Sequence, residues 1–197
     1  MTTIAAVPAT TAARVRGTAW WGMMSLIATE AMIFAGLLGS YFFTRAAAKE
    51  WPLGGIEAPE LGRIVLFTVV LLGSSVPLFW AEAAIRRGDV RGLRIGLFLS
   101  FVLGVAFLVN LGFEYDELTF GARDNAYGSL FYAITGLHGL HVLVGLLMNL
   151  VVQAKARLGR VSKDRHVTVT VFGMYWHFVD VVWIFVFVSL YVSPHLT

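Results

Sequence analysis

The sequence predicts an all-α integral membrane protein with five transmembrane helices in one bundle. Of its 197 residues, 58% are hydrophobic and 14% are charged, which is a more apolar balance than soluble domains show. Five long runs contain at most one charged residue each, and crossing the hydrocarbon core takes about 20 helical residues. The length of these runs, without alternation of apolar and polar residues, excludes membrane strands.

The five predicted spans are residues 17–44, 64–81, 95–113, 125–154 and 167–192. The first contains one charged residue, Glu30, and is too long for a cleaved signal peptide, so we expect it to be retained. The second contains Pro77, which can kink a membrane helix. The last contains one charged residue, Asp180. Residues 1–17, rich in Ala and Thr, are predicted to be a mobile tail, which leaves residues 18–197 as the membrane domain.

Small residues every four positions indicate where helices meet closely. One such stripe lies in the third span and the other lies in the first. The stripes are Gly96, Ser100 and Gly104, and Ala31, Ala35 and Gly39. Small side chains allow the backbones of membrane helices to approach each other, so each stripe is expected to face another helix.

Lysine and arginine residues indicate the orientation of the bundle. The N-terminal segment and the second and fourth connections hold eleven of them, and the first and third connections hold four. The positive-inside rule then predicts a cytoplasmic N-terminus and a C-terminus outside. In the fourth connection, Arg157, Arg160 and Lys163 are expected to contact anionic phospholipid. Because the basic residues occupy short connections between spans, nucleic-acid binding is not expected.

Five ionisable residues on three of the spans lie at similar depth, near the middle of the membrane. They are Glu30, His138, His141, His177 and Asp180. A charge at the bilayer centre costs about 2.5–3.5 kcal/mol on insertion scales, so these side chains are expected to face other helices and to be paired. The three-residue spacings, His138 to His141 and His177 to Asp180, place each pair on one helical face. The residues predict a buried polar cluster that joins helices; proton handling and a metal site are alternatives.

Two features argue against a metal site at these residues. The chain has no cysteine, which excludes thiolate-held metals and haem attached through paired cysteines. The His-x-x-His pattern with one nearby glutamate lacks the repeated Glu-x-x-His pairs of di-iron helical bundles. The residues therefore give only a weak signal for a metal site.

Three motifs resemble subunit III of the haem–copper terminal oxidases. They are WWGMMSLIATEAMIFAGLLGSYFF at residues 20–43, FYAITGLHGLHVLVGLL at residues 131–147 and YWHFVDVVWIFVF at residues 175–187. FEYDEL, at residues 113–118, resembles the acidic motif at the outer end of a helix in that family. The likeness extends over nearly the whole chain after the tail, in the family's order. Many members have seven helices, and this chain resembles the five-helix bacterial form.

This resemblance implies an accessory core subunit of a cytochrome c oxidase in the bacterial plasma membrane. Haem and copper would belong to subunits I and II, so this chain would have no catalytic residue and would bind no metal or redox cofactor. It would pack mainly against subunit I, bind phospholipid and support proton uptake. Glu30 corresponds to the family's buried glutamate. His138 and His141 correspond to its paired histidines, and His177 and Asp180 to its His-Phe-Val-Asp motif.

Three other functions stay open. They are subunit III of a quinol oxidase, an accessory protein related to that of nitric oxide reductase, and a free-standing proton-coupled membrane carrier. Glutamate at position 30 favours the cytochrome c branch, because aspartate is common there in the quinol branch. A carrier is expected to show internal repeats and a discontinuous helix, and neither is visible in the sequence.

Overall fold

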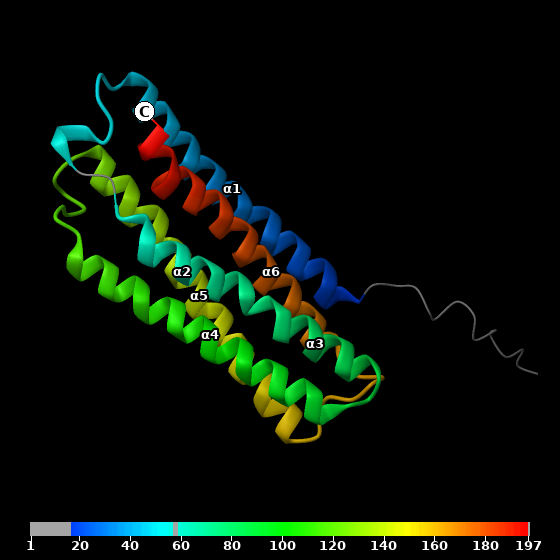
Figure 1. Ribbon diagram of the computed structural model, residues 1–197. Helices are drawn as coiled ribbons and strands as arrows, with labels where there is room; N and C mark the ends of the chain where they lie inside the picture. Colours follow the sequence, from blue (N-terminus) through cyan, green and yellow to red (C-terminus); the bar gives the residue numbers. More distant parts are fainter. Residues whose placement is uncertain (1–16, 57–58, 197) are drawn as a thin grey trace, which may run out of the picture.

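The computed structural model describes residues 17–56 and 59–196, and in these ranges the chain forms an elongated helical bundle (Figure 1). The main helices are α1 (Thr18–Ala47), α2 (Leu61–Gly73), α3 (Ser75–Arg86), α4 (Val90–Glu117), α5 (Ala126–Arg157) and α6 (Val167–Phe187). A 3₁₀ turn, η1 (Leu53–Gly55), follows α1, and η2 (Val188–Val192) and η3 (Ser193–Leu196) continue α6. The predicted tail, apart from Gly17, lies outside the described residues.

The prediction of five membrane-spanning helices is confirmed. Five helical segments of the described chain are long and apolar enough to cross a membrane, and α2 with α3 counts as one of them. They extend beyond the predicted apolar runs, because Arg86, Glu117 and Arg157 still belong to helices. Charged residues at helix ends reach the polar surface of a bilayer, so they set the edge of an apolar run without ending the helix.

The second span is broken at Ser74, as the position of Pro77 predicts. Proline has no backbone N–H, so the carbonyl four residues before Pro77, that of Gly73, loses its usual helical partner. The backbone N–H of Ser74 still donates to the carbonyls of Val70 and Leu71 at 3.0 Å, and α3 starts at the next residue. The side chains of Ser74 and Ser75, at this break, both form hydrogen bonds with residues of α6.

Helices α3 and α4 form a tight antiparallel pair. Gly88 adopts a φ of +87° in the turn between them, a conformation that favours glycine, and Asp89 caps α4 by accepting from the N–H of Gly92 at 2.9 Å. Further along, Gly96 packs directly against the backbone carbonyl of Pro77. The small residues of α4 therefore face another helix, as predicted.

Trp176 lies fully buried in the centre of the bundle, where α4, α5 and α6 meet. A Cβ atom added to Gly104 or to Gly145 would lie 2.7 Å from its ring. Its indole N–H donates to the Ser74 hydroxyl at 2.9 Å. One large side chain thus fills the space that two glycines leave, and its polar atom is satisfied by the break between α2 and α3.

Helix α1 lies at the side of the bundle against α5 and α6 (Figure 1). It buries three of its side chains, those of Met23, Phe34 and Tyr41. The small-residue stripe of α1 faces outward, so its prediction of contact with another helix is not met within this chain. The members of that stripe are Ala31, Ala35 and Gly39, all of which are exposed.

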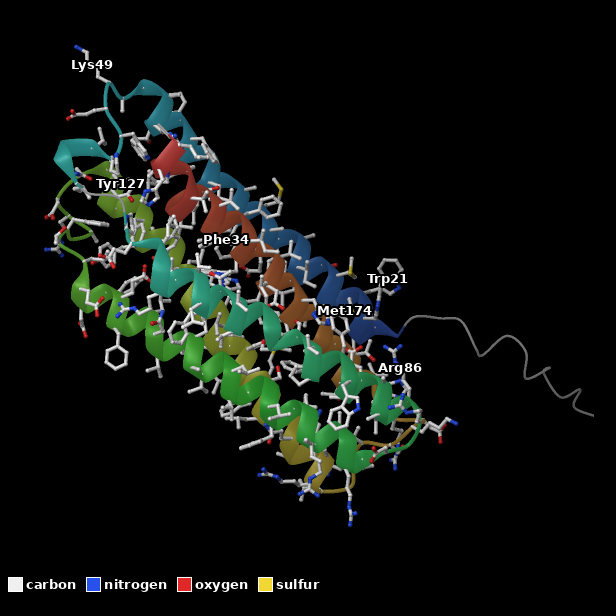
Figure 2. All side chains as sticks on the ribbon, in the orientation of Figure 1. Trp21, Phe34, Lys49, Arg86, Tyr127 and Met174 are labelled. Carbon is white, nitrogen blue, oxygen red and sulfur yellow. The ribbon has the colours of Figure 1, made fainter. Side chains whose placement is uncertain are left out.

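The two ends of the bundle differ in charge. The start of α1 lies at the same end as the α3–α4 turn and the α5–α6 connection (Figure 1), and these two connections carry most of the lysine and arginine. Arg86 marks this end in Figure 2, whereas Lys49 and Tyr127 lie at the opposite end. This arrangement agrees with the predicted topology, and the cytoplasmic location of the basic end stays a prediction.

Candidate functional site

Within residues 17–56 and 59–196, the predicted polar cluster is divided into two separate hydrogen-bonded groups and one histidine without a polar partner. The first group joins α1 to α5: Oε2 of Glu30 lies 3.2 Å from Nε2 of His141. Phe34, one turn after Glu30, lies between the two ends of α1 in Figure 2 and packs edge-on against His141, with ring centres 5.1 Å apart. The contact therefore lies near the middle of the bundle's length, as the sequence predicts, but the Glu30 side chain is 25% exposed at the outer side of the bundle and is not fully buried within this chain.

The Glu30–His141 contact requires a shared proton. Nδ1 of His141 lies 2.8 Å from the carbonyl oxygen of Leu137, so Nδ1 carries a hydrogen and donates it. Nε2 then either accepts a proton from neutral Glu30 or, in a charged imidazolium, donates one to the carboxylate. In both cases one proton lies between the two side chains. Tyr175 of α6 adds a third helix, because its hydroxyl donates to the carbonyl oxygen of His141 at 3.2 Å.

The second group joins α6 to α3. The Ser75 hydroxyl donates to Oδ2 of Asp180, and its oxygen also lies 3.0 Å from Nδ1 of His177. A hydroxyl has a single hydrogen to donate, so Nδ1 of His177 is the donor toward the serine oxygen. The three side chains thus form a directed chain from His177 through Ser75 to Asp180. The His177 ring also stacks on Phe79 with 4.2 Å between ring centres.

His138 does not join either group. Its side chain is fully buried, and within the described parts of the chain neither ring nitrogen has a hydrogen-bond partner. The ring packs against Trp183 at 4.7 Å and against the edge of Phe107 at 5.9 Å between ring centres. His138 and His141 share a helical face, but His138 serves as an aromatic packing residue.

Two further polar residues of the α3–α6 interface were not predicted. Ser75 carries no charge, so a serine in an apolar run gives no signal in the sequence. Glu82 of α3 packs its carboxylate directly against Gly173 of α6, one turn before His177. Its side chain is 14% exposed and accepts from Arg86 at 3.0 Å. The interface therefore carries polar groups from the basic end of the bundle toward Asp180.

The acidic FEYDEL motif provides a buried carboxyl at the other end of α4. Glu114 is 8% exposed, whereas Glu117 lies at the surface and forms two hydrogen bonds with Arg63, at 2.5 and 2.6 Å. These residues border a cavity of about 430 Å³ between α2 and α4. The motif thus connects two helices at the end of the bundle opposite the basic connections.

The three basic residues predicted to contact lipid lie at the basic end. Arg157 is in the last turn of α5, and its guanidinium lies 3.4 Å from the side-chain oxygen of Gln153. Arg160 and Lys163 are exposed in the α5–α6 connection. Their contact with phospholipid stays a prediction.

No three His, Asp or Glu side chains lie close enough to hold a metal ion within residues 17–56 and 59–196. The reason is geometric: Glu30 and His141 face each other across α1 and α5, whereas His177 and Asp180 face α3. That the chain binds no metal or haem stays a prediction.

The fold and these polar contacts define a multi-pass helical membrane protein in which ionisable residues of the spans join pairs of helices. Over residues 3–194 the sequence matches the family cytochrome c oxidase subunit III, and the chain belongs to this family. The predicted resemblance to the haem–copper oxidases is confirmed. The protein is therefore a subunit of an oxidase complex.

Curated relatives support the same assignment. Cytochrome c oxidase subunit 3 of Thermostichus vulcanus is 36% identical over 172 residues, which cover 87% of this chain and 85% of that protein. The subunit 3 of Synechocystis sp. is 37% identical over 172 residues, covering 87% and 74%. The subunit 3 of Anopheles gambiae is 37% identical over 177 residues, covering 87% and 68%.

Proposed function

We propose that this chain is an accessory core subunit of a bacterial cytochrome c oxidase in the plasma membrane. It contributes no redox centre, and haem and copper belong to subunits I and II. Oxygen reduction and proton translocation are then activities of the whole complex. The absence of cysteine supports this proposal, because a dinuclear copper centre bridged by thiolates requires cysteine ligands.

The observation that carries the proposal is that the ionisable residues of the membrane spans form contacts between helices of this chain. Glu30 contacts His141 across α1 and α5, and Asp180 contacts Ser75 across α6 and α3. Each of these carboxyl groups joins two helices of the same chain. Such a bundle is suited to serve as a rigid neighbour that stabilises subunit I.

Support of proton uptake is the second part of the proposed function. The α3–α6 interface carries Glu82, His177, Ser75 and Asp180 in order from the basic end. These groups are able to hold and pass protons, and Glu82 lies nearest the end predicted to be cytoplasmic. The polar groups at that end would keep protons available near the uptake site of the complex.

The third part is phospholipid binding. Arg157, Arg160 and Lys163 lie together at the basic end, and a basic residue near an anionic membrane surface contributes about 1 kcal/mol to binding. The chain would then hold lipid at the inner face of the complex, next to its neighbouring subunits.

The test compares oxygen consumption by complexes with and without this chain, followed over time and across pH. Without the chain we expect a nearly unchanged initial rate, because the redox centres remain, followed by faster loss of activity. The defect should increase at high pH, where bulk protons are scarce. A complex that keeps its activity at every pH would contradict the stabilising and proton-supplying roles. Loss of the initial rate with subunits I and II still assembled would contradict the accessory role.

The electron donor is tested on the same preparation. A complex purified through a tag on this chain should contain subunits I and II and oxidise reduced cytochrome c. Oxidation of quinol without oxidation of cytochrome c would place the chain in a quinol oxidase instead.

A further inference from the structure

A pocket of about 310 Å³ opens between α4 and α5 at the basic end of the bundle. Its polar side is formed by Arg91 and Arg94 in the first turns of α4 and by Arg157 in the last turn of α5. Gln153 is the fourth polar residue of the lining. The start of α4 and the end of α5 are far apart in the sequence but adjacent in space, and together they bring three guanidinium groups to one cavity.

A ladder of buried amides positions one of these arginines. The Asn149 side chain donates to the carbonyl oxygen of Leu97 at 3.2 Å, and Gln153 donates to the side-chain oxygen of Asn149 at 2.8 Å. The oxygen of Gln153 is then free to face Arg157, at 3.4 Å. Asn149 is fully buried and Gln153 is 5% exposed. Because buried amides keep fixed partners, the ladder holds Arg157 toward the pocket.

The positive charge of the pocket is not neutralised within the described chain. No carboxylate lies within ion-pair distance of the three arginines in residues 17–56 and 59–196. The nearest acidic residue in the sequence is Asp89, whose carboxylate accepts from the N–H of Gly92 and caps α4. Like charges that converge on one cavity repel each other, and an anion between them removes that repulsion.

The remaining lining of the pocket is apolar and faces outward. Ile95, Phe98 and Leu99 are 52%, 55% and 45% exposed. Together with Arg91 and Arg94 they follow the spacing of one face of α4, so the apolar surface starts one turn from the guanidinium groups. A ligand of this site has an anionic end for the arginines and an apolar part for Phe98 and its neighbours.

We propose that this pocket binds the headgroup of an anionic glycerophospholipid, with one acyl chain lying along Ile95, Phe98 and Leu99. Basic pockets between membrane helices on the cytoplasmic side bind such headgroups. A soluble anion makes no use of the apolar wall, and a zwitterionic lipid brings a cation next to three arginines. The proposal deepens the lipid-binding part of the proposed function by naming the site and the lipid class. It depends on the membrane setting alone, so it fails or stands independently of the oxidase assignment.

The test measures lipid binding to the full-length chain, delipidated in mild detergent, by native mass spectrometry. The lipids are phosphatidylglycerol and phosphatidylcholine with the same acyl chains. We expect phosphatidylglycerol to bind at least about tenfold more tightly, since each arginine near the headgroup contributes roughly a factor of five. The same affinity for both lipids would overturn the proposal.

A pair of matched triple variants localises the site. Replacing Arg91, Arg94 and Arg157 by glutamine should lower the affinity for phosphatidylglycerol about tenfold to a hundredfold. The control triple replaces Arg87, Lys155 and Arg165, which lie at the same end, outside the pocket lining and outside the set expected to contact lipid, and should change the affinity less than threefold. Equal losses in both triples would show a general surface-charge effect and overturn the pocket.

Two further measurements complete the test. The double variant Arg91→Gln/Arg94→Gln leaves the Arg157–Gln153 contact intact, and it serves if the triple variant does not fold. Inorganic phosphate at millimolar concentration should compete weakly, and full competition would identify a site for soluble anions. In cells, a photo-cross-linker at position 98 should capture lipid, and capture of a protein in its place would assign this face to a protein partner.

Discussion

Glu30 and His141 meet 3.2 Å apart on the inner side of α1, the helix that buries the fewest side chains of the main spans. Most of α1 faces outward, and Met23, Phe34 and Tyr41 are its buried side chains. In lipid, an outward-facing apolar helix gains little from burial, because acyl chains are as apolar as its side chains. The Glu30–His141 contact is therefore a polar attachment of α1 to the rest of the bundle.

Replacing Glu30 separates the hydrogen bond from the charge. Glu30→Gln keeps a donor for Nε2 of neutral His141, so its free energy of unfolding should change by less than about 1 kcal/mol. Glu30→Ala leaves that nitrogen without a partner and should cost about 1–3 kcal/mol. The measurement is thermal unfolding in detergent with half-lives at a fixed temperature. Equal half-lives of the parent and both variants would show that the contact does not hold α1.

The packing around Trp176 predicts that alanine substitutions at two glycines of α4 have different effects on stability. Gly104→Ala places a methyl group 2.7 Å from the Trp176 ring, and overpacking of this kind costs about 1–3 kcal/mol. Gly112→Ala, also in α4, meets nothing within 4 Å and should be neutral or slightly stabilising, since alanine favours a helix. The check is the melting temperature of each variant. A stable Gly104→Ala protein would mean that Trp176 lies elsewhere.

The full-length chain, expressed alone and folded in detergent, should bind neither haem nor copper. Glu30 contacts His141 between α1 and α5, whereas His177 and Asp180 face α3. In the part of the chain that the structure describes, these side chains therefore form no shared set of metal ligands. Metal analysis and visible absorbance provide the measurement. Stoichiometric iron or copper that disappears in a His141→Ala or His177→Ala variant would contradict the accessory role.

The spans were predictable from the sequence because charge is costly in a membrane and the hydrocarbon core has a fixed thickness. The depth of Glu30 and Asp180 followed from the same argument. The ends of the spans were less predictable. Arg86 and Arg157 interrupt the apolar pattern, but their helices continue to them because long charged side chains reach the polar surface.

The division of the polar cluster was not predictable, because depth says nothing about which neighbouring helix a residue faces. His138 and His141 have the spacing of partners, but Phe34, Phe107 and Trp183 surround the first with aromatic rings. Ser75 carries no charge, and its contact with Asp180 depends on how α3 starts after the break at Ser74. Only the packing of the helices against one another shows these relations.

A double-mutant cycle tests the series of hydrogen bonds from His177 through Ser75 to Asp180 at the α3–α6 interface. Ser75→Ala removes the group that donates to Asp180 and accepts from His177, and Asp180→Asn keeps the size of the side chain while removing its charge. Hydrogen bonds to charged groups contribute about 1.5–3 kcal/mol, so we expect each single change to destabilise the protein and the double change to cost less than their sum. Coupling near zero would mean that Ser75 and Asp180 act independently.

The control cycle combines Ser75→Ala with Gly112→Ala, a distant exposed position of α4 where additive effects are expected. His177→Gln provides a third readout, because a glutamine amide can still donate toward Ser75 but cannot take up a proton. If the hydrogen bonds from His177 through Ser75 to Asp180 only fix the packing of α3 against α6, His177→Gln should keep both the stability and the pH profile of oxygen consumption by the complex. If these three residues also pass protons, His177→Gln should keep the stability and alter the pH profile. A His177→Gln protein as unstable as Ser75→Ala would contradict the donor role assigned to Nδ1.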